Sequence, residues 1–523
     1  MPRRNEPVKS GVCIDSRPEI VFGLVGALGT DLEKIGHELQ QALLAVNYSC
    51  SVIRISRLFD EFTPKPRSKT SKKSNSPSES IIANKMEVGD LLRERYGKDF
   101  CARLAVAAIH RTRNRSHPQK FAHATIVHSL KRKEEIHFLQ ETYQTKYITI
   151  GIWSPDDERQ VLIVNNLRKE RFQGSKMKYE QAALELMSRD EKDSINPCGQ
   201  DVRGAFELAD IYVSLKFGHN VSNSVSRIIR LLFGHPFETP TRDEYAMFHA
   251  SGTSLRSSAA GRQVGAAVVD QDGEILVSGM NEVPKAGGGQ YWCGDIPDHR
   301  DFSYGYDFND LQKLLIVDDI LSKLSENGWL SNSGHKQNDR ETLGIMALGS
   351  NGPLEKSTIR NIIEFGRIIH AEMACICTAA RRGTPLNGAS IFITTYPCHE
   401  CARLIIAAGI KEIVYIDPYP KSQTSIMYKD EILQYLPTES HVLLRPFEGI
   451  APKLYRHIFH NIDRKRNAIT GEFEKWQALK ATPRYVEMSE STQSLYVSEA
   501  ITIRLLSVSK TGIRLRTDIK RQG

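Results

Sequence analysis

Apolar runs of strand length recur through the first 215 residues and alternate with amphipathic stretches. The segment DLEKIGHELQQALLAV (31–46) repeats its apolar residues at the spacing of a helix that buries one face. The runs predict strands at 19–26, 51–56, 122–130, 146–153 and 209–215. Strands that alternate with helices favour a parallel α/β sheet for this part of the chain.

The pattern changes after residue 230. A helix is predicted at 239–259, and a hairpin joined by the turn QDG is predicted at 262–281. A glycine- and aspartate-rich insertion follows at roughly 285–360. Beyond it the pattern predicts helices at 368–383 and 398–409 and strands at 390–395, 411–417 and 442–447. This order indicates a second α/β domain.

These changes divide the chain into four parts. We predict a flexible tail (1–17), a first domain (18–230), a second domain (231–460) and a C-terminal extension (461–523). Residues 63–80 are polar and aperiodic, which favours a disordered insertion. The C-terminal extension is charged and helical at first and strand-like at YVSEAITIRLLSV, and the sequence assigns it no role.

Composition is that of a soluble globular protein, with 40% hydrophobic and 25% charged residues among 523. The amino terminus lacks the apolar stretch of a secretory signal, and no apolar run is long enough to span a membrane. Nine cysteines are too few and too scattered for a disulfide framework, so a reducing cytoplasm is expected. The net charge of +8 lies mainly in local basic runs, which are typical of solvated loops but leave nucleic-acid binding open. The positive sign also suits an anionic nucleotide substrate.

Two cysteines three residues apart stand where a predicted strand meets a predicted helix. Cys398 and Cys401 occur in SIFITTYPCHECARLI, and His370 opens a helix 28 residues upstream. Three protein ligands are typical of a catalytic Zn²⁺ that keeps one position for water. Glu372, two residues beyond the histidine, is placed to shuttle protons without coordinating the metal. A structural zinc site and a redox pair are the alternatives.

Other residues near this motif are weaker candidates for metal ligands. His399 lies between the two cysteines, but adjacent residues on a helix point apart. Cys375 and Cys377 are expected to be small core residues. In the insertion, Cys293, Asp295, Asp298 and His299 form either a second metal cluster or part of a loop that covers the active site or contacts another copy.

The combination H-x-E and P-C-x-x-C is the signature of zinc-dependent nucleobase deaminases. Residues 239–450 resemble the cytidine and deoxycytidylate deaminase superfamily, specifically the deoxycytidylate branch, through HAEMA, TYPCHECARLIIAAGI, VYIDPYPKS and GMNEVP. The resemblance implies an α/β/α domain with a mixed five-stranded sheet, bound Zn²⁺, a hexamer with an allosteric nucleotide site, and Asn281 as a substrate-binding residue. We add Arg262, Tyr419 and Lys421 as candidates for contacts to the substrate.

The turn GLVGALGTD follows the first predicted strand and opens a helix, so its amides could bind an anion. It departs from a Walker A motif in spacing and lacks the lysine, which leaves Gly23, Gly26, Gly29 and Thr30 as candidate nucleotide-binding residues, with a plain turn as the alternative. Three further segments, at 128–143, 187–191 and 199–213, resemble P-loop nucleoside and nucleotide kinases and include the lid-like Arg189. The resemblance implies a P-loop kinase-like parallel-sheet domain that binds ATP with Mg²⁺ or another nucleotide.

A degenerate kinase-like domain followed by a deoxycytidylate deaminase domain resembles the anti-phage dCTP deaminases of bacterial defence systems. The resemblance implies deamination of dCTP and dCMP during infection, and in some relatives inhibition by a small RNA. The first domain is then expected to be regulatory. The alternatives are a housekeeping dCMP deaminase, a polynucleotide cytidine deaminase, and a signalling NTPase with a structural zinc.

Overall fold

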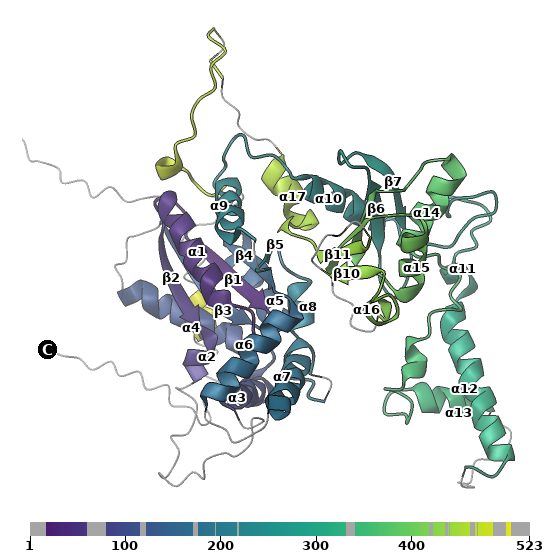
Figure 1. Ribbon diagram of the computed structural model, residues 1–523. Helices are drawn as coiled ribbons and strands as arrows, with labels where there is room; N and C mark the ends of the chain where they lie inside the picture. Colours follow the sequence, from purple (N-terminus) through teal and green to yellow (C-terminus); the bar gives the residue numbers. More distant parts are fainter. Residues whose placement is uncertain are drawn as a thin grey trace, which may run out of the picture. The chain divides into compact units, whose positions relative to one another are not determined.

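The computed structural model of the protein describes most of the chain, in two compact units (Figure 1). The first unit comprises residues 1–244 and 448–523, and the second comprises 245–447. The described residues are 17–59, 80–115, 122–170, 176–193, 195–216, 219–330, 340–417, 422–434, 438, 440–460, 466–467, 469–484 and 498–503. The predicted disordered insertion, 63–80, falls outside them except for its last residue. In the described part, no helix combines the length and apolar character needed to cross a membrane.

The first unit is built on a six-stranded sheet with the order β12-β5-β4-β1-β3-β2. All neighbouring strands are parallel except β12, which pairs antiparallel with β5. Five strands confirm the positions that the apolar runs predict, and β12 was not predicted. Their bounds are β1 (Ile20–Gly26), β2 (Ser49–Arg54), β3 (His123–Leu130), β4 (Tyr147–Trp153), β5 (Ile211–Ser214) and β12 (Gly449–Ile450).

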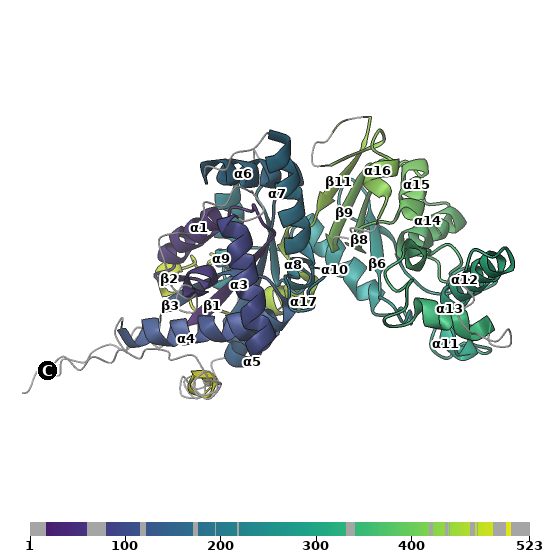
Figure 2. The same cartoon turned by 90° about the horizontal axis from the view of Figure 1, so that it is seen from below.

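Helices cover both faces of this sheet (Figure 2). On one face, α1 (Leu32–Ala45), α9 (Val221–Leu232) and α17 (Pro452–Phe459) bury their apolar sides against β1 and its neighbours. On the other face lie α2 (Ile55–Leu58), α4 (Phe100–Arg115), α5 (Lys133–Tyr143) and α8 (Val202–Phe206). A smaller apolar cluster joins α3 (Ile81–Tyr96), α6 (Asp156–Lys169) and α7 (Lys176–Glu191). Two short 3₁₀ helices are η3 (Gln144–Lys146) and η5 (Ala478–Lys480).

The C-terminal segment returns to the first unit, so the contacts divide the chain at 244/245 and 447/448 rather than at the predicted 230/231 and 460/461. The physical reason is strand pairing, because β12 extends the first sheet and Ile450 and Ile458 join its buried core. The backbone N–H of Arg484 also donates to the Leu232 carbonyl oxygen (2.8 Å). The described parts of the predicted C-terminal extension, chiefly 469–484 and 498–503, therefore belong to the first unit.

A short helix at 498–503 replaces the strand that YVSEAITIRLLSV predicted. It carries Glu499, whose side chain is fully buried and accepts hydrogen bonds from Arg113, Tyr143 (2.9 Å) and His110 (3.1 Å). Arg113 also donates to Glu19 (2.6 Å). Over the described residues 498–503 the strand prediction was wrong, because the β-branched Ile501 and Thr502 suggested extended structure, whereas this ion-pair cluster stabilises a helical turn.

The second unit holds a six-stranded mixed sheet with the order β10-β11-β9-β8-β6-β7. Strands β6 (Gly265–Val269) and β7 (Ile275–Met280) form the predicted hairpin, and β6 is antiparallel to β8 (Ser390–Thr395). Strands β9 (Glu412–Asp417), β11 (Val442–Pro446) and β10 (Ile432–Gln434) continue from β8 in parallel. The expected count of five strands was wrong, since the three-residue β10 adds an edge strand too short for its pattern to predict.

Helices of the second unit are α10 (Arg242–Ser254), which begins at the boundary, α14 (Ala371–Arg382), α15 (His399–Ala407) and α16 (Thr424–Met427). Within the predicted insertion lie α11 (Asp301–Tyr304), α12 (Phe308–Glu326) and α13 (Arg340–Leu348), followed by the 3₁₀ helix η4 (Thr358–Asn361). Helices α12 and α13 pack on each other as a hairpin (Figure 1).

Close approach of helices to the second sheet requires glycine at two strand positions. A Cβ at Gly279 on β7 would lie 2.8 Å from the Ala371 carbonyl oxygen and 2.9 Å from the Cys375 nitrogen, both on α14. A Cβ at Gly265 on β6 would collide with the Ala250 carbonyl oxygen on α10. The glycine of the GMNEVP motif thus allows the first turn of α14 to lie directly on the sheet.

The buried Glu499 gives a first prediction about the extension. Replacing it with alanine leaves Tyr143 and Arg113 short of an acceptor in a dry environment, although Arg113 keeps Glu19. We expect Glu499→Ala to lower the free energy of unfolding by about 3 kcal/mol, the lower end for a broken buried ion pair. Urea denaturation followed by circular dichroism measures this, with Ile501→Ala as the control because Ile501 is exposed on the same short helix. Equal stability of the two variants would contradict the packing of this segment.

Candidate metal centre

Two helices of the second unit begin side by side and supply the three candidate ligands. His370 is the N-cap of α14 and Cys398 is the N-cap of α15. Cys401 lies in the first turn of α15, where its backbone N–H donates to the Cys398 sulfur (3.4 Å). The positive end of a helix dipole favours thiolate at such positions. Strand β8 ends at Thr395, and Pro397 directly precedes the cap residue Cys398. The extended segment therefore stops just before α15 begins.

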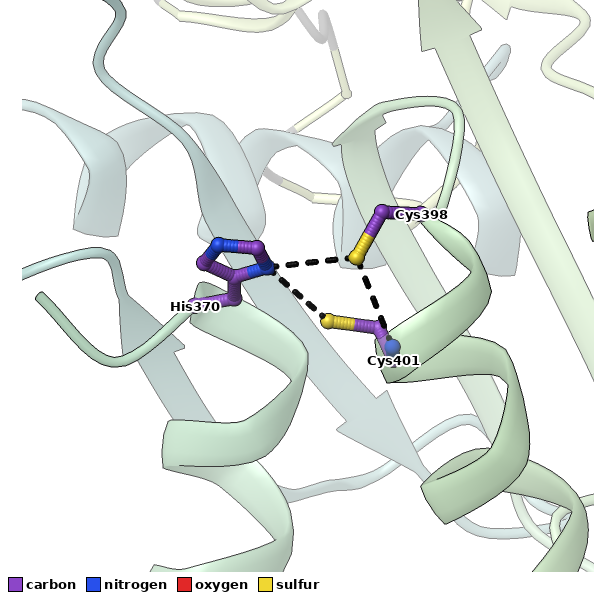
Figure 3. Close-up of side chains that lie close together, drawn as sticks. All are labelled: His370, Cys398 and Cys401. Atoms are coloured by element: carbon purple, nitrogen blue, oxygen red, sulfur yellow. Dashed lines mark hydrogen bonds between the residues drawn. The ribbon is translucent and has the colours of Figure 1, made fainter. Parts of the chain in front are cut away.

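The ligand atoms converge on one point (Figure 3). His370 Nδ1 lies 3.3 Å from the sulfur of Cys398 and 3.3 Å from that of Cys401. All three ligand atoms lie within 4.8 Å of one another. Both cysteine side chains are buried, and the histidine is half-buried. The structure thus brings together the three residues that the H-x-E and C-x-x-C spacing singled out.

Protonation in this cluster is strongly coupled. The hydrogen bond from Cys401, together with His370, lowers the pKa of Cys398 to about 4, although burial opposes the shift. The same contact with the Cys398 sulfur raises the pKa of His370 to about 9. The pKa of Cys401 is raised well above its ordinary value by its hydrogen bond to Cys398 and by burial. Zinc binds cysteine as thiolate and histidine as the neutral ring, so metal binding would release the protons that this cluster holds.

The donor set fits Zn²⁺. Zinc–sulfur bonds of about 2.3 Å and zinc–nitrogen bonds of about 2.0–2.1 Å in a tetrahedron place ligand atoms roughly 3.5 Å apart, close to the nitrogen–sulfur separations found here. Two sulfurs and an imidazole are soft ligands that favour zinc over magnesium or calcium. Within the part of the chain that the structure describes, this is the group of histidine, cysteine and acidic side chains with metal-binding geometry.

Glu372 lies in the first turn of α14, two residues after His370. Its side chain is only 3% exposed. Burial raises the pKa of this carboxyl, and the negative charge of Cys398 raises it further, while His370 opposes the shift. A buried carboxyl of raised pKa beside a metal site is suited to accept and return a proton at neutral pH.

The structure describes two of the four residues predicted to contact the substrate, Asn281 and Arg262. Asn281 Oδ1 accepts from the Val264 N–H (2.7 Å), and its Nδ2 donates to the Arg262 carbonyl oxygen (2.7 Å), so this side chain holds the entry to β6. The guanidinium of Arg262 donates to Thr395 Oγ1 (3.1 Å) and to Asp417, at the ends of β8 and β9. Tyr419 and Lys421 lie outside the described residues. Substrate binding by these four residues stays a prediction.

Glu282 is a site residue that sequence reasoning missed. Its side chain is fully buried, with carboxylate oxygens accepting from the backbone N–H groups of Ser258 (2.9 Å) and Val283 (2.8 Å). Its carbonyl oxygen accepts from the Ile369 N–H (3.2 Å), directly before the ligand His370. Glu282 therefore ties the loop after β7 to the start of α14. A single glutamate in a loop carries no sequence signal for this role.

The weaker metal candidates do not join the cluster. The imidazole of His399 lies 3.9 Å from Glu364, and Cys375 is buried in the core as predicted. The prediction for Cys377 was wrong, because its position on α14 faces solvent. In the insertion, Asp295 pairs with Lys285 (2.9 Å) and Asp298 pairs with Arg300. With their carboxylates paired to cations, Asp295 and Asp298 form no second metal site with Cys293 and His299 among the described residues.

The glycine turn of the first unit is engaged by other parts of the same unit. Gly23 lies within β1, where a Cβ would collide with the Tyr147 hydroxyl, and Gly26 ends the strand. The backbone N–H of Leu28 donates to the Asp190 carboxylate (2.7 Å). The hydroxyl of Thr30 is buried without a hydrogen-bond partner. The Leu28 N–H, which would donate to a phosphate, thus already donates to a carboxylate of the protein. This arrangement gives no support to the prediction that the unit binds ATP and Mg²⁺.

The second unit is similar in sequence to known proteins. Residues 240–417 match the family model described as the cytidine and deoxycytidylate deaminase zinc-binding region. The chain is 44% identical over 55 residues to the deoxycytidylate deaminase of Enterobacteria phage T2 and 41% identical over 56 residues to that of Homo sapiens. Each alignment covers 10% of this chain and, respectively, 29% and 30% of the relative. The chain thus spans less than a third of the curated relatives that it matches. Its residues 240–417 are thus similar to the zinc-binding region of these deaminases.

The solved structures to which this chain is similar include a dCMP deaminase from the cyanophage S-TIM5 in complex with dCMP and dUMP. That chain is 18% identical, with 40% of this chain and 98% of the cyanophage chain covered and a TM-score of 0.22.

Metal content tests the centre directly. We expect the purified protein to carry one zinc per chain, measured by inductively coupled plasma mass spectrometry, because three ligand atoms already converge. Cys398→Ser and Cys401→Ser should each reduce the content to a small fraction of one, since serine is a poor zinc ligand. Cys377→Ser is the matched control, because this exposed cysteine lies on α14 outside the cluster, and it should keep its zinc. Equal zinc in all variants would rule out this ligand set.

Proposed function

We propose that the protein is a zinc-dependent hydrolase that converts the cytosine of deoxycytidine nucleotides to uracil and releases ammonia. The observation that carries the proposal is the cluster of His370, Cys398 and Cys401 with the buried Glu372 in the same helix turn as the histidine. A structural zinc site of four ligands, or a redox pair of cysteines, would leave this carboxyl without a purpose.

The residues divide the chemistry between them. Held by the three ligands, Zn²⁺ would lower the pKa of a bound water to about 7 and so supply a nucleophile at neutral pH. Glu372 would take one proton from the nucleophilic water as it attacks C4 of the base and pass it to N3, and would then carry the second proton of the same water from the C4 hydroxyl to the amino nitrogen. The C4–N bond then breaks, ammonia leaves and a C4 carbonyl remains. Burial of Glu372 raises its pKa and so strengthens it as a proton carrier.

Deoxycytidine nucleotides are the proposed substrates because the matched relatives are named deoxycytidylate deaminases. We propose that dCTP and dCMP are both accepted. Asn281 would contact the sugar with its second Nδ2 hydrogen, and Arg262, Tyr419 and Lys421 would contribute to nucleotide binding. A polynucleotide cytidine deaminase and a housekeeping dCMP deaminase are the other candidates: conversion of oligonucleotides alone would favour the first, and conversion of dCMP without dCTP would favour the second.

We further propose a role in bacterial defence against phage, through depletion of dCTP in the cytoplasm. The resemblance of the two-part chain to anti-phage dCTP deaminases supports this role, as does the presence of a large first unit beside the deaminase-like one. In the same proposal the first unit restrains the deaminase, an inhibitory small RNA can contribute, and the active form is an oligomer, with a hexamer as the family precedent.

Glu372→Gln tests the catalytic assignment. An amide keeps the shape of the side chain but cannot carry the proton, so we expect the rate of dCMP and dCTP deamination to fall by roughly 10²–10⁴. Ultraviolet absorbance of the cytosine-to-uracil conversion measures the rate, and metal analysis should show that zinc is kept. Deamination of single-stranded oligonucleotides is measured beside that of dCMP and dCTP.

Glu274→Gln is the matched control, because Glu274 is an exposed glutamate in the turn that joins β6 to β7. It should leave the rate within about two-fold, as expected for a surface substitution. Full activity of Glu372→Gln would contradict the proposed proton transfer by Glu372. Conversion of the oligonucleotides alone would transfer the proposal to a polynucleotide substrate.

A fragment of residues 245–447 tests the restraint by the first unit. These bounds follow the observed second unit and retain both zinc-binding helices together with all strands of its sheet. We expect the fragment to deaminate dCTP faster than the full chain, by ten-fold or more, when both are assayed at equal zinc content. Circular dichroism checks that it folds. A folded, zinc-loaded fragment with no greater activity than the full chain would contradict the restraint.

A further inference from the structure

The segment that leads into the first cysteine ligand is hydrogen-bonded to residues that follow β9. After β8 ends, the backbone N–H of Tyr396 donates to the Asp417 carbonyl oxygen at the end of β9 (2.8 Å). The chain then passes through Pro397 to Cys398, the N-cap of α15. Residues 422–425, where α16 begins beside α15, supply the next contacts (Figure 1).

Two hydroxyl groups of this stretch converge on one carbonyl oxygen. The hydroxyl of Ser422 donates to the Pro397 carbonyl oxygen (2.7 Å), and the hydroxyl of Thr424 donates to the same oxygen (3.0 Å). The two hydroxyl oxygens lie 2.9 Å apart, and Thr424 is fully buried. Three oxygens thus share two hydroxyl protons. Every arrangement of these protons leaves at least one hydrogen bond to the carbonyl oxygen.

The orientation of the Pro397 carbonyl group decides where the side chain of Cys398 points. The proline ring fixes φ at about −65°, so ψ is the one free backbone rotation that Pro397 retains. Because the peptide unit is planar, this rotation moves the Pro397 carbonyl oxygen and the Cα of Cys398 together. A carbonyl group held by two hydroxyls therefore also holds the direction in which the cysteine side chain leaves the backbone.

Of the two cysteines, Cys398 depends more on such a restraint. It is the cap residue, with φ −75° and ψ 165°, so its own backbone is extended rather than helical. Cys401 lies within the first turn of α15, where the helix itself sets the direction of the side chain. A contact outside the helix is therefore needed to fix the sulfur of Cys398 relative to that of Cys401.

We propose that Ser422 and Thr424 are positioning residues for the zinc centre, and that their hydroxyls keep Cys398 in the direction that metal binding requires. Ligand distances at a metal site vary by only about 0.2 Å, so a small turn of this peptide would move the sulfur out of range. The other cap ligand is restrained in a similar way, because Ile369, directly before His370, donates its N–H to the Glu282 carbonyl oxygen (3.2 Å). The inference rests on the metal centre of the proposed function, but not on its reaction or substrate.

The double variant Ser422→Ala with Thr424→Val removes both hydroxyls and keeps the volume of the buried threonine. We expect its zinc to be released to an excess of a chromogenic chelator about ten-fold faster than from the unmodified full chain, the lower end for loss of contacts outside the ligand shell. Each single variant should stay within about two-fold, because one donor to the Pro397 carbonyl oxygen remains. Ser422→Ala with Thr424→Ser restores one hydroxyl and should bring the release rate back to that of the single variants.

Cobalt in place of zinc reports the ligand geometry itself. Co²⁺ held by thiolates absorbs visible light, and the absorption depends on the arrangement of the sulfurs around the ion. We expect the fully loaded double variant to differ in this spectrum from the unmodified chain. Ser390→Ala is the matched control, because Ser390 is buried at the opposite end of β8 and its hydroxyl donates to Glu412 (2.8 Å). This control loses a buried hydroxyl but should keep both the zinc release rate and the cobalt spectrum.

Unchanged zinc release in the double variant would overturn the proposal, and so would an unchanged cobalt spectrum. Equal changes in Ser390→Ala would also contradict it, because they would show a general loss of stability rather than a change at Cys398. Normal zinc release with a raised KM for the nucleotide would place the two hydroxyls in substrate binding instead. An unmodified chain that holds zinc but deaminates no nucleotide would contradict the proposed function alone, since zinc release and the cobalt spectrum would still decide the role of Ser422 and Thr424.

Discussion

The meeting of two helix N-termini on one sheet is the constraint on which the candidate site depends. His370 and Cys398 each cap a helix, so their side chains can converge only if α14 and α15 begin at the same place. Gly279 lets the first turn of α14 lie against β7, and the turn at Pro397 starts α15 directly after β8. Because Glu372 follows two residues after the ligand, the same packing buries the carboxyl and places it beside the cluster. Ligand geometry, carboxyl burial and the raised pKa of Glu372 thus share one structural cause.

Sequence reasoning located this site because its signal is local. The H-x-E and C-x-x-C spacings fix which residues share a helix turn, and the apolar runs give the strands between them. It could not find Glu282, whose role arises from a bridge to Ile369 across 87 positions of sequence. It also missed β10 and β12, three and two residues long, because strands this short carry no periodicity. Pairing with a distant strand, rather than local preference, decides whether such segments are extended.

The division into units shows the same limit at a larger scale. A boundary predicted from composition assumes that neighbouring residues belong to the same domain, whereas here residues from 448 onward return to the first sheet. The return is fixed by Ile450, which pairs with Ile211 and lies fully buried beside α9. Glu244, at the other boundary, accepts from the Ile450 N–H (2.9 Å) and from Arg227 (2.9 Å). Both connections between the units therefore start from one buried, hydrogen-bonded point of the first unit.

The glycine turn illustrates why a motif alone does not establish a function. Its spacing suggests an anion site, but the amide of Leu28 is bound by Asp190, a residue on α7 that no local pattern connects to the turn. The same Asp190 carboxylate also lies 2.8 Å from Lys131 Nζ, so it pairs with the lysine that follows β3. A parallel sheet with an occupied phosphate position still retains the hollow at the carboxyl ends of its strands.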